Sequence, residues 1–244
     1  MRSITKREYV HENLGDRFES ALSAYDTQRR VETLIDEFLP DAELTGKSVL
    51  DVGTGLGFFA DRLKRRGAVV TAVDIGEKLL KRVSERVGCE CIQADALSLS
   101  HYFGHRRFDV VVSSECIEHT PDPQAALREM VRVAKPGGLI SVSTPNLLWL
   151  PVVKTATVLK LRPFDGLEKF STFSSIRRTL EESGATVLRE KGLHLFPFQL
   201  HFHGLSRWCD GHLQGLRMLM INLCVLARKS NDDRATPSSS PSLH

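Results

Sequence analysis

The spacing of apolar residues along the chain changes several times, and each change predicts a new element. Between residues 18 and 39, apolar residues such as Val31, Leu34 and Phe38 recur at helical spacing, and Pro40 ends the pattern. We therefore expect an amphipathic helix that leads into the main domain. Beyond it, short continuous apolar runs alternate with helical patterns, as in a chain that passes repeatedly from strand to helix.

In the main domain, the continuous apolar runs recur at regular intervals, with helical patterns between them. Residues 96–106 form a polar connection. The alternation predicts an α/β fold with a Rossmann-like, doubly wound, mostly parallel sheet of seven strands. The two final strands form a hairpin-like edge pair in this interpretation, so the last strand is expected to be antiparallel. The expected strands are 49–52, 69–74, 89–94, 108–114, 139–143, 185–191 and 216–227, and the helices between them are 58–66, 77–87, 123–134 and 174–183.

Composition is that of an ordinary soluble domain with two flanking segments. The 244 residues are 41% apolar and 26% charged, and a net charge of +3 argues against nucleic acid as a partner. We expect a helical segment at 1–40, a domain at 41–229 and a disordered tail at 230–244. Five cysteines without a C-x-x-C pair favour a reducing compartment. No apolar leader or membrane-spanning run is evident, so we expect a cytoplasmic protein.

Residues 147–163 are unusually apolar for a connection, and their charged residues are all basic. Three interpretations are open: a lid over the substrate, a surface that contacts lipid, or a helix packed on the domain. The second of these would place the protein at the periphery of a membrane.

Three glycines at alternate positions follow the first predicted strand. The segment Asp51-Val52-Gly53-Thr54-Gly55-Leu56-Gly57 continues into a helical pattern, which predicts a strand, a tight loop and a helix. Such a loop lets the backbone approach a nucleotide-like ligand, and the helix start adds unpaired N–H groups. The spacing differs from the G-x-G-x-x-G of dinucleotide-binding loops. The carboxylate of Asp51 suits an ammonium group, and S-adenosylmethionine carries an ammonium and no phosphate.

Acidic residues follow successive predicted strands at one edge of the sheet. Asp74 comes one helix and one strand after Asp51, where a carboxylate can accept hydrogen bonds from both ribose hydroxyls. Asp95 and Glu115 follow the next two strands. Because ligands of a parallel sheet lie beyond the carboxyl ends of its strands, these acids predict a single site.

Several motifs of the chain match those of one enzyme family. They are the glycine loop, Glu115-Cys116-Ile117-Glu118-His119, Lys135-Pro136-Gly137-Gly138 and Gly192-Leu193-His194. On these residues the chain resembles class I S-adenosylmethionine-dependent methyltransferases over residues 25–228, and within them the O-methyltransferases of ubiquinone biosynthesis. The glycine loop and Lys-Pro-Gly-Gly are typical of the whole class. Glu-x-x-Glu-His is more selective, although small-RNA 2′-O-methyltransferases share it.

The resemblance implies where the cofactor would be held. Its methionine end would lie at the glycine loop, its ribose at the end of the second strand and its adenine at the end of the third. The end of the fourth strand would line one side of the cofactor site. An arginine of the N-terminal helix would add a contact, and Arg29 is the alternative to Arg30 for that role. The implied cofactor-binding residues are Arg30, Asp51, Gly53, Gly55, Gly57, Asp74, Ile75, Asp95, Ala96 and Ser114.

The same resemblance implies a divalent metal ion. Glu115, Glu118 and His119 match the family's metal motif, and two carboxylates with an imidazole could hold Mg²⁺, which would orient a catechol and lower the pKa of its hydroxyl. The equal alternative is that Glu118 and His119 brace the loop. As catalytic base, His119 is the first candidate and His194 the second, because an imidazole titrates near neutral pH. Two further histidines could join a metal set or be plain loop residues, His201 and His203.

Two departures from the ubiquinone family leave the substrate open. The first 24 residues lack its tryptophan-rich opening, and the segment after Asn146 differs throughout. We expect an S-adenosylmethionine-dependent methyltransferase that acts on a hydroxyl of a small or lipid-linked molecule, with a quinol or catechol favoured. The alternatives are methyl transfer to a sugar, an amine or an RNA 3′ end, and a non-catalytic subunit that binds the cofactor.

Overall fold

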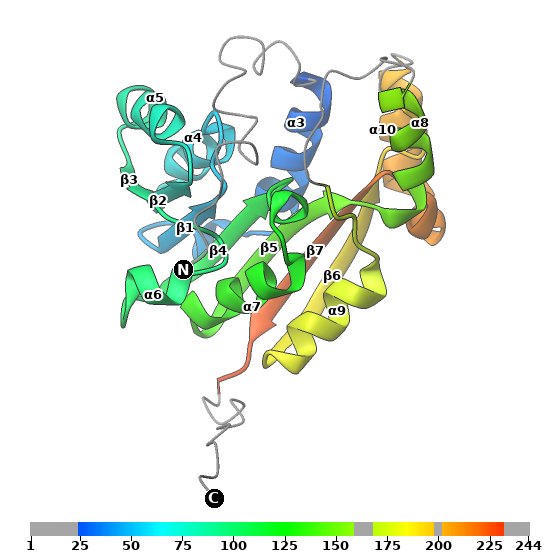
Figure 1. The fold of residues 1–244 in the computed structure, drawn as a ribbon. Helices are drawn as coiled ribbons and strands as arrows, with labels where there is room; N and C mark the ends of the chain where they lie inside the picture. Colours follow the sequence, from blue (N-terminus) through cyan, green and yellow to red (C-terminus); the bar gives the residue numbers. More distant parts are fainter. Residues whose placement is uncertain (1–23, 159–167, 198–201, 232–244) are drawn as a thin grey trace, which may run out of the picture.

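A twisted sheet runs through the computed structural model, which describes residues 24–158, 168–197 and 202–231 (Figure 1). The strands lie in the order β3-β2-β1-β4-β5-β7-β6. Neighbours from β3 to β5 are parallel, and β7 is antiparallel to both β5 and β6. The predicted seven-stranded, mostly parallel sheet with an antiparallel last strand is confirmed. The strands are β1 (Ser48–Val52), β2 (Val69–Asp74), β3 (Glu90–Gln93), β4 (Phe108–Ser114), β5 (Ala134–Pro145), β6 (Ala185–Leu193) and β7 (Asn222–Lys229).

Helices cover both faces of the sheet. In front of it in Figure 1 lie α6 (Leu99–Phe103), α7 (Pro123–Val133) and α9 (Phe173–Glu182). The opposite face packs against α4 (Phe58–Arg65), α5 (Glu77–Val87) and the π-helical η1 (Glu32–Glu37), which continues α3 (Ala24–Val31). Helix α8 (Leu150–Val158) follows β5 through η4, and α10 (His203–His212) lies beside it and contacts His194, directly after β6. Short 3-10 turns complete the described elements: η2 (Asp41–Glu43), η3 (Ile117–His119), η4 (Leu147–Trp149) and η6 (Gln214–Leu219).

The central strands are apolar on both faces because both faces are covered. Along β1, Val49 belongs to the core on the α4 side and Leu50 to the core on the α7 side, and both are fully buried. Phe103 of α6 meets Phe108 of β4 edge to face, with ring centroids 4.9 Å apart. Each such buried side chain contributes about 1.5–3 kcal/mol. The two cores together fix the strands and therefore the positions of their carboxyl ends.

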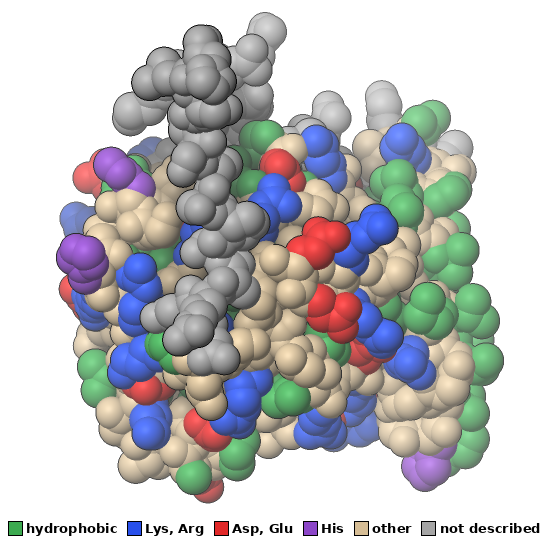
Figure 2. All heavy atoms as spheres, turned by 90° about the horizontal axis from the view of Figure 1, so that it is seen from below, with side chains coloured by type: hydrophobic (Ala, Val, Ile, Leu, Met, Phe, Trp, Pro, Cys, Tyr) green, Lys and Arg blue, Asp and Glu red, His purple; other side chains and the backbone are tan. Residues whose placement is uncertain are grey.

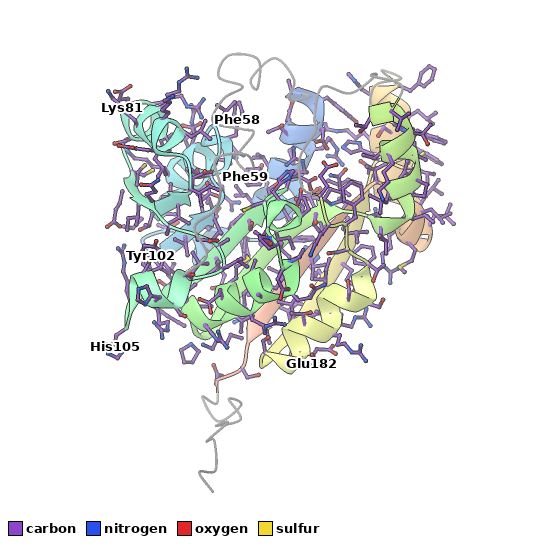
Figure 3. The ribbon with its side chains drawn as sticks, viewed as in Figure 1. Phe58, Phe59, Lys81, Tyr102, His105 and Glu182 are labelled. Carbon is purple, nitrogen blue, oxygen red and sulfur yellow. The ribbon has the colours of Figure 1, made fainter. Side chains whose placement is uncertain are left out.

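Helix α4 shows how the chain leaves the glycine loop. Phe58 and Phe59 are its first two residues, and they point in different directions (Figure 3). Phe59 is buried in the core, whereas Phe58 stays 39% exposed and lies under the Arg86 guanidinium, 5.1 Å from the ring centroid. The first turn of α4 is therefore packed into the core through Phe59, whereas Phe58 lies at the surface.

Helices α5, α7 and α9 have a terminus at a capping residue. At the start of α7, Asp122 accepts a hydrogen bond of 2.9 Å from the Ala125 N–H, and Pro123 takes the first helical position. Thr172 and Ser175 form a reciprocal capping box at the start of α9. Gly88 ends α5 in the left-handed conformation. These local signals explain why the helix positions were predictable.

The structure departs from the prediction in residues 96–106. This stretch, predicted as a polar connection, contains α6. Leu99 and Phe103 are four residues apart, so one helical turn directs both into the core. The helix is too short for its period to stand out from the polar residues around it.

The last strand is also shorter than predicted and differently placed. It begins at Asn222 rather than at residue 216, because β5 and β6 both end opposite Asn222 and leave the earlier residues no strand to pair with. The two final strands do pair antiparallel at one end of the sheet, as predicted, with β6 outermost and β7 between β5 and β6.

Some predicted segments fall outside the described residues: 18–23 of the first helix, 159–163 of the apolar segment and 232–244 of the tail. In the portion that the structure describes, no helix is both long enough and apolar enough to cross a membrane.

Candidate active site

The backbone at the end of β1 turns in a way that requires glycine. Gly53 has a φ of +72°, and a Cβ at this position would overlap the side chain of Cys116. Gly57, with a φ of +76°, precedes α4, and a Cβ there would lie 2.9 Å from Val83 Cγ2. The predicted strand, loop and helix are therefore formed. The loop packs against the segment that follows β4.

Acidic side chains lie at or just after the carboxyl ends of β2 and β3, along the same edge of the sheet as the glycine loop. Asp74 accepts hydrogen bonds from the Gly55 N–H at 3.0 Å and the Gly76 N–H at 2.9 Å, one on each carboxylate oxygen. Asp95 accepts one of 2.9 Å from the Leu97 N–H. Each carboxylate oxygen has a second lone pair, so Asp74 can still accept a ribose hydroxyl. The geometry is compatible with the predicted ribose and adenine positions, which stay predictions.

The other predicted cofactor-binding residues at this edge of the sheet are notable for their backbone contacts and packing. The Ile75 carbonyl accepts a hydrogen bond of 2.9 Å from Gln93 Nε2, which joins the turns after β2 and β3. Ala96 is buried, and among the described residues a Cβ at Gly55 would meet only the Gly53 carbonyl oxygen, at 4.0 Å, apart from its chain neighbours. The described residues therefore leave room for a ligand to approach the loop at Gly55.

Asp51 is buried at the end of β1. Thr54 Oγ1 donates a hydrogen bond of 2.7 Å to its Oδ2. Burial raises the pKa of Asp51 to about 7, and the nearby Asp74 carboxylate acts in the same direction, whereas the Thr54 bond opposes the rise. The carboxyl group therefore changes its charge near neutral pH. An ammonium group bound beside it would favour the ionised form.

Of the two candidate arginines, Arg30 reaches the edge of the sheet. Its Nη1 donates a hydrogen bond of 2.6 Å to Ser114 Oγ at the end of β4. Arg29 points elsewhere and bonds to Glu32 at 2.7 Å and to Asp210 at 3.2 Å. The geometry therefore favours Arg30 over Arg29 as the arginine of the site.

Two acids follow the end of β4, of which Glu115 is half-buried and Glu118 is buried. Glu115 takes a left-handed conformation, with a φ of +50°, and its Oε1 accepts a hydrogen bond of 3.1 Å from Ser143 Oγ. Glu118 is 1% exposed and accepts one of 3.2 Å from Thr144 Oγ1. Burial raises the pKa of Glu118 well above its usual value, and the neighbouring Glu115 carboxylate raises it further. The burial of Glu118 and its contact with Thr144 are compatible with the alternative role of bracing the loop, which stays a prediction.

The predicted metal ligands do not form a metal site in this geometry. Glu118 Oε1 lies 4.0 Å from His119 Nε2, and Glu115 faces Ser143 and Arg30 instead. Within residues 24–158, 168–197 and 202–231, no group of three His, Cys, Asp or Glu side chains is arranged to hold a metal ion. The described residues therefore give the predicted Mg²⁺ site no support.

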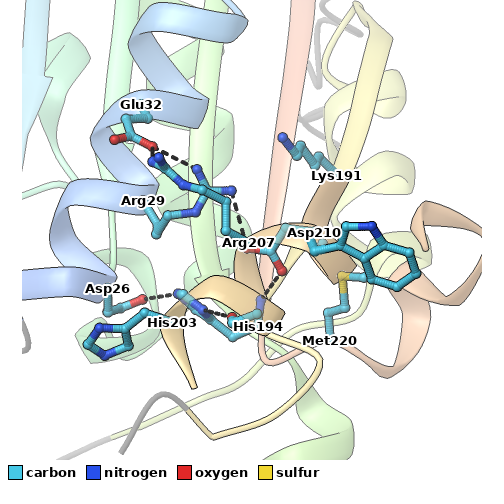
Figure 4. Close-up of polar contacts among 12 residues, drawn as sticks. Asp26, Arg29, Glu32, Lys191, His194, His203, Arg207, Asp210 and Met220 are labelled. Atoms are coloured by element: carbon cyan, nitrogen blue, oxygen red, sulfur yellow. Dashed lines mark hydrogen bonds and ion pairs between the residues drawn. The ribbon is translucent and has the colours of Figure 1, made fainter. Parts of the chain in front are cut away.

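The two predicted bases lie in different surroundings. His194 is fully buried, with Nε2 3.0 Å from Asp26 Oδ1 and Nδ1 3.2 Å from Ser206 Oγ (Figure 4). The side chain of His119 is 27% exposed. A substrate hydroxyl can therefore approach His119, whereas both ring nitrogens of His194 are already engaged. Of the other two histidines, His203 stacks on Tyr25 with centroids 3.9 Å apart, and His201 lies outside the described residues.

Sequence reasoning missed the acids that hold the arginines and His194. Asp26 accepts from Arg30 at 2.9 Å, and this acid four residues before an arginine on a helix was a readable signal. Burial would raise the pKa of Asp26, but Arg30 and His194 outweigh burial and lower it. Asp210 accepts from the His194 N–H at 2.8 Å. No local pattern marks Asp210, because its partners come from β6 and α3.

We expect Asp51→Asn to stabilise the protein increasingly as the pH rises from about 4 to about 7. In this window the folded chain keeps a proton on Asp51 that the unfolded chain has lost, because the folded pKa is about 7. The wild type therefore loses up to about 4 kcal/mol relative to the variant by the upper end of the window. Urea unfolding of both proteins at pH 4.5 and pH 8 measures this difference.

Asp61→Asn is the matched control for this comparison. Asp61 pairs with Arg65 on the exposed side of α4, so its substitution should change the free energy of unfolding by less than about 1 kcal/mol. If the gap between Asp51→Asn and the wild type is the same at both pH values, the raised pKa of the Asp51 carboxyl is contradicted.

Known proteins match both the sequence and the fold. Residues 50–142 match the family described as a methyltransferase domain. The ubiquinone biosynthesis O-methyltransferase of Pseudomonas putida (strain GB-1) is 34% identical over 172 residues, which are 66% of this chain and 74% of that protein. The enzyme of the same name from Pseudomonas syringae pv. tomato (strain ATCC BAA-871 / DC3000) has the same identity and coverage.

Solved structures of lower identity share the fold. The structure of magnesium protoporphyrin IX methyltransferase (ChlM) from Synechocystis PCC 6803 with bound SAH has a TM-score of 0.66 at 17% identity and covers 92% of this chain and 98% of its own. A putative sarcosine dimethylglycine methyltransferase from Galdieria sulphuraria has a TM-score of 0.60 at 19% identity, with 84% and 86% covered. Together with the Pseudomonas relatives, they place the chain among the class I S-adenosylmethionine-dependent methyltransferases, and it belongs to the family of the ubiquinone biosynthesis O-methyltransferases.

Proposed function

We propose that this methyltransferase acts on a hydroxyl group of a small or lipid-linked molecule, with a quinol or catechol as the favoured acceptor. The name of the Pseudomonas relatives, which states O-methylation in ubiquinone biosynthesis, supports the acceptor class. The observation that carries the proposal is an exposed apolar surface at the same end of the sheet as the candidate site.

This apolar surface is formed by η4, α8, α10 and η6. Val158 is 80% exposed and Trp208 52% exposed. The Trp149 Nε1–H donates a hydrogen bond of 2.8 Å to the Leu219 carbonyl, which joins η4 to η6. Hydrophobic side chains gather along this edge of the molecule (Figure 2). Its principal exposed residues are Leu148, Val152, Val158, Leu205, Trp208 and Met218.

The exposed and half-buried charged residues within these four elements are basic, although Arg207 pairs with Glu32 of η1 and Arg217 with Glu190 of β6. Lys154, Arg207 and Arg217 are basic, and the one acid in these four elements, Asp210, is buried. Exposed apolar side chains with a tryptophan and flanking bases suit the interface of an anionic lipid surface. We therefore propose that the enzyme contacts anionic lipid here and takes its acceptor from that surface, as a protein that is otherwise cytoplasmic.

The proposed reaction is an in-line displacement. S-adenosylmethionine supplies a methyl group on a positively charged sulfur, which is already an activated leaving group. The acceptor oxygen forms a bond to the methyl carbon, the carbon–sulfur bond breaks with its electron pair going to sulfur, and the hydroxyl proton goes to a base. The chain has to hold the reactants in line and take this proton, and alignment alone supplies several kcal/mol of the barrier.

His119 is the base in this proposal. It lies on η3, directly after the end of β4, and is the more accessible of the two predicted bases. The carbonyl of Glu118 accepts a hydrogen bond of 2.8 Å from the Lys169 N–H, which holds η3 in place. An imidazole held at the carboxyl edge can accept a proton near neutral pH.

We expect catechol or a prenylated catechol to yield an O-methyl product with S-adenosylmethionine, identified by mass spectrometry and NMR. His119→Ala should lower kcat by about 100-fold or more, because a general base contributes that much. It should leave the affinity for S-adenosylhomocysteine unchanged. His105→Ala is the matched control, since His105 is exposed after α6, far from the carboxyl edge (Figure 3).

The other acceptors and the metal are tested in the same assay. Methylation of a sugar, an amine or an RNA 3′ end in place of the catechol would contradict the proposal, and cofactor binding without transfer would indicate a non-catalytic subunit. Parallel runs with Mg²⁺ and with EDTA test the predicted metal. A rate that EDTA lowers in the wild type but not in Glu118→Gln would support a metal ion, and equal rates would reject it.

The apolar surface predicts binding to vesicles. We expect the wild type to sediment with phosphatidylglycerol vesicles more than with phosphatidylcholine vesicles, and less so at high salt. Two charges introduced by Val152→Glu and Leu205→Glu should lower the bound fraction about tenfold, because each buried apolar side chain is worth more than 1 kcal/mol. Leu188→Glu, on the exposed face of β6, is the control. Equal binding by all three proteins would contradict a lipid contact at this surface.

A further inference from the structure

A buried acid holds the arginine of the candidate site. Asp26 Oδ2 accepts hydrogen bonds from Arg30 Nε at 3.1 Å and from Arg30 Nη2 at 2.9 Å. Asp26 and Arg30 are 8% and 5% exposed. A charged pair so far from water is held rigidly, because either partner alone would pay a desolvation cost of several kcal/mol.

The contact with Asp26 determines where Arg30 points. The guanidinium is planar, so fixing Nε and Nη2 on Asp26 also fixes the direction of Nη1. That nitrogen donates the 2.6 Å hydrogen bond to Ser114 Oγ, which lies 3.0 Å from Ser143 Oγ. The arginine is therefore aimed at the ends of β4 and β5, next to the glycine loop.

Asp26 is itself held from the other side. Its Oδ1 lies 3.0 Å from Nε2 of His194, a residue in the left-handed conformation with a φ of +62°. A non-glycine residue in this conformation costs roughly 1 kcal/mol, and two contacts from α10 retain it there: the His194 N–H donates to Asp210, and the ring faces Ser206. One carboxylate of α3 thus contacts both Arg30 and His194, and Figure 4 shows how His194 joins it to Asp210 of α10, part of the apolar surface.

We propose that Asp26, held by His194, is a positioning residue that aims Arg30 at bound S-adenosylmethionine. Without Asp26 the long arginine side chain would distribute over several rotamers, and the cofactor would have to order it on binding. This inference rests on the cofactor site proposed for Arg30. His194 thereby has a role in the site that does not require it to accept a proton from the substrate.

A double-mutant cycle with Arg30 tests this role. Calorimetry on the full chain measures the Kd for S-adenosylhomocysteine in the wild type, Asp26→Ala, Arg30→Ala and the double variant. We expect each single substitution to weaken binding about tenfold, as for a lost charge-assisted hydrogen bond. The double variant should bind within about twofold of Arg30→Ala, because Asp26 acts only through Arg30. Losses that multiply in the double variant would overturn the inference.

Two further variants separate positioning from folding. Asp26→Asn keeps the side-chain volume and an oxygen for Arg30, so we expect it to recover most of the affinity that Asp26→Ala loses. Glu32→Gln removes a carboxylate from the continuation of the same helix that bonds Arg29 and Arg207, not Arg30, and should bind like the wild type. Equal losses in Glu32→Gln and Asp26→Ala would show a general effect of charge or stability and overturn the proposal.

The double-mutant cycle and the methylation assay test the positioning role and the proposed acceptor separately. If Arg30→Ala binds S-adenosylhomocysteine like the wild type, the positioning role is overturned, whereas methylation of a hydroxyl acceptor would stand. If the cycle shows the expected coupling and no hydroxyl acceptor is methylated, the positioning role stands and the proposed acceptor fails.

Discussion

The ion pair between Asp26 and Arg30 is the interaction on which the architecture of the site depends. An apolar core cannot hold a charge without a partner, since an unpaired buried charge costs several kcal/mol. Burial lowers the pKa of Arg30, but Asp26 and the two acids that follow β4, Glu115 and Glu118, outweigh burial and raise it. Helix α3 must therefore lie across the carboxyl edge of the sheet, beside the loop that follows β4.

The contact between Asp26 and Arg30 lies between a polar region and an apolar region. On one side, polar groups converge between the glycine loop and the end of β4, where a charged sulfonium cofactor fits. On the other side, α10 presents Leu205 and Trp208 outward and Ser206 and Asp210 inward, within three helical turns. A single short helix thus belongs both to the surface proposed to meet lipid and to the contacts that hold His194.

The fold could be predicted from the sequence because its signals are local. Continuous apolar runs such as Val69–Asp74 indicate strands covered on both faces, and the alternate glycines after Asp51 indicate a sharp turn at a strand end. The loop and the acids Asp74 and Asp95 do lie along one edge, as their spacing implied. The predicted last strand was too long because pairing, not hydrophobicity, decides where a strand begins.

The contacts within the site were not predictable in the same way. His194 was chosen as a base from its chemistry alone, and only the packing of α3 and α10 shows that the ring is buried. Asp210 lies 181 residues from Arg29 in the chain, so no spacing rule connects them. Likewise, Glu115, Glu118 and His119 share a motif, yet Glu115 adopts a left-handed conformation and accepts from Ser143, and Glu118 accepts from Thr144, contacts that the motif does not specify. Sequence spacing gives the order of residues along the backbone, whereas side-chain direction depends on the surrounding fold.

The most direct test of the account is a crystal structure of the full chain with S-adenosylhomocysteine. The account predicts the ligand across the ends of β1 and β2, with its ribose hydroxyls on Asp74, its methionine end at Gly53 and Arg30 within hydrogen-bonding distance. A ligand bound at another edge of the sheet, or at this edge with Arg30 turned away from it, would contradict the account.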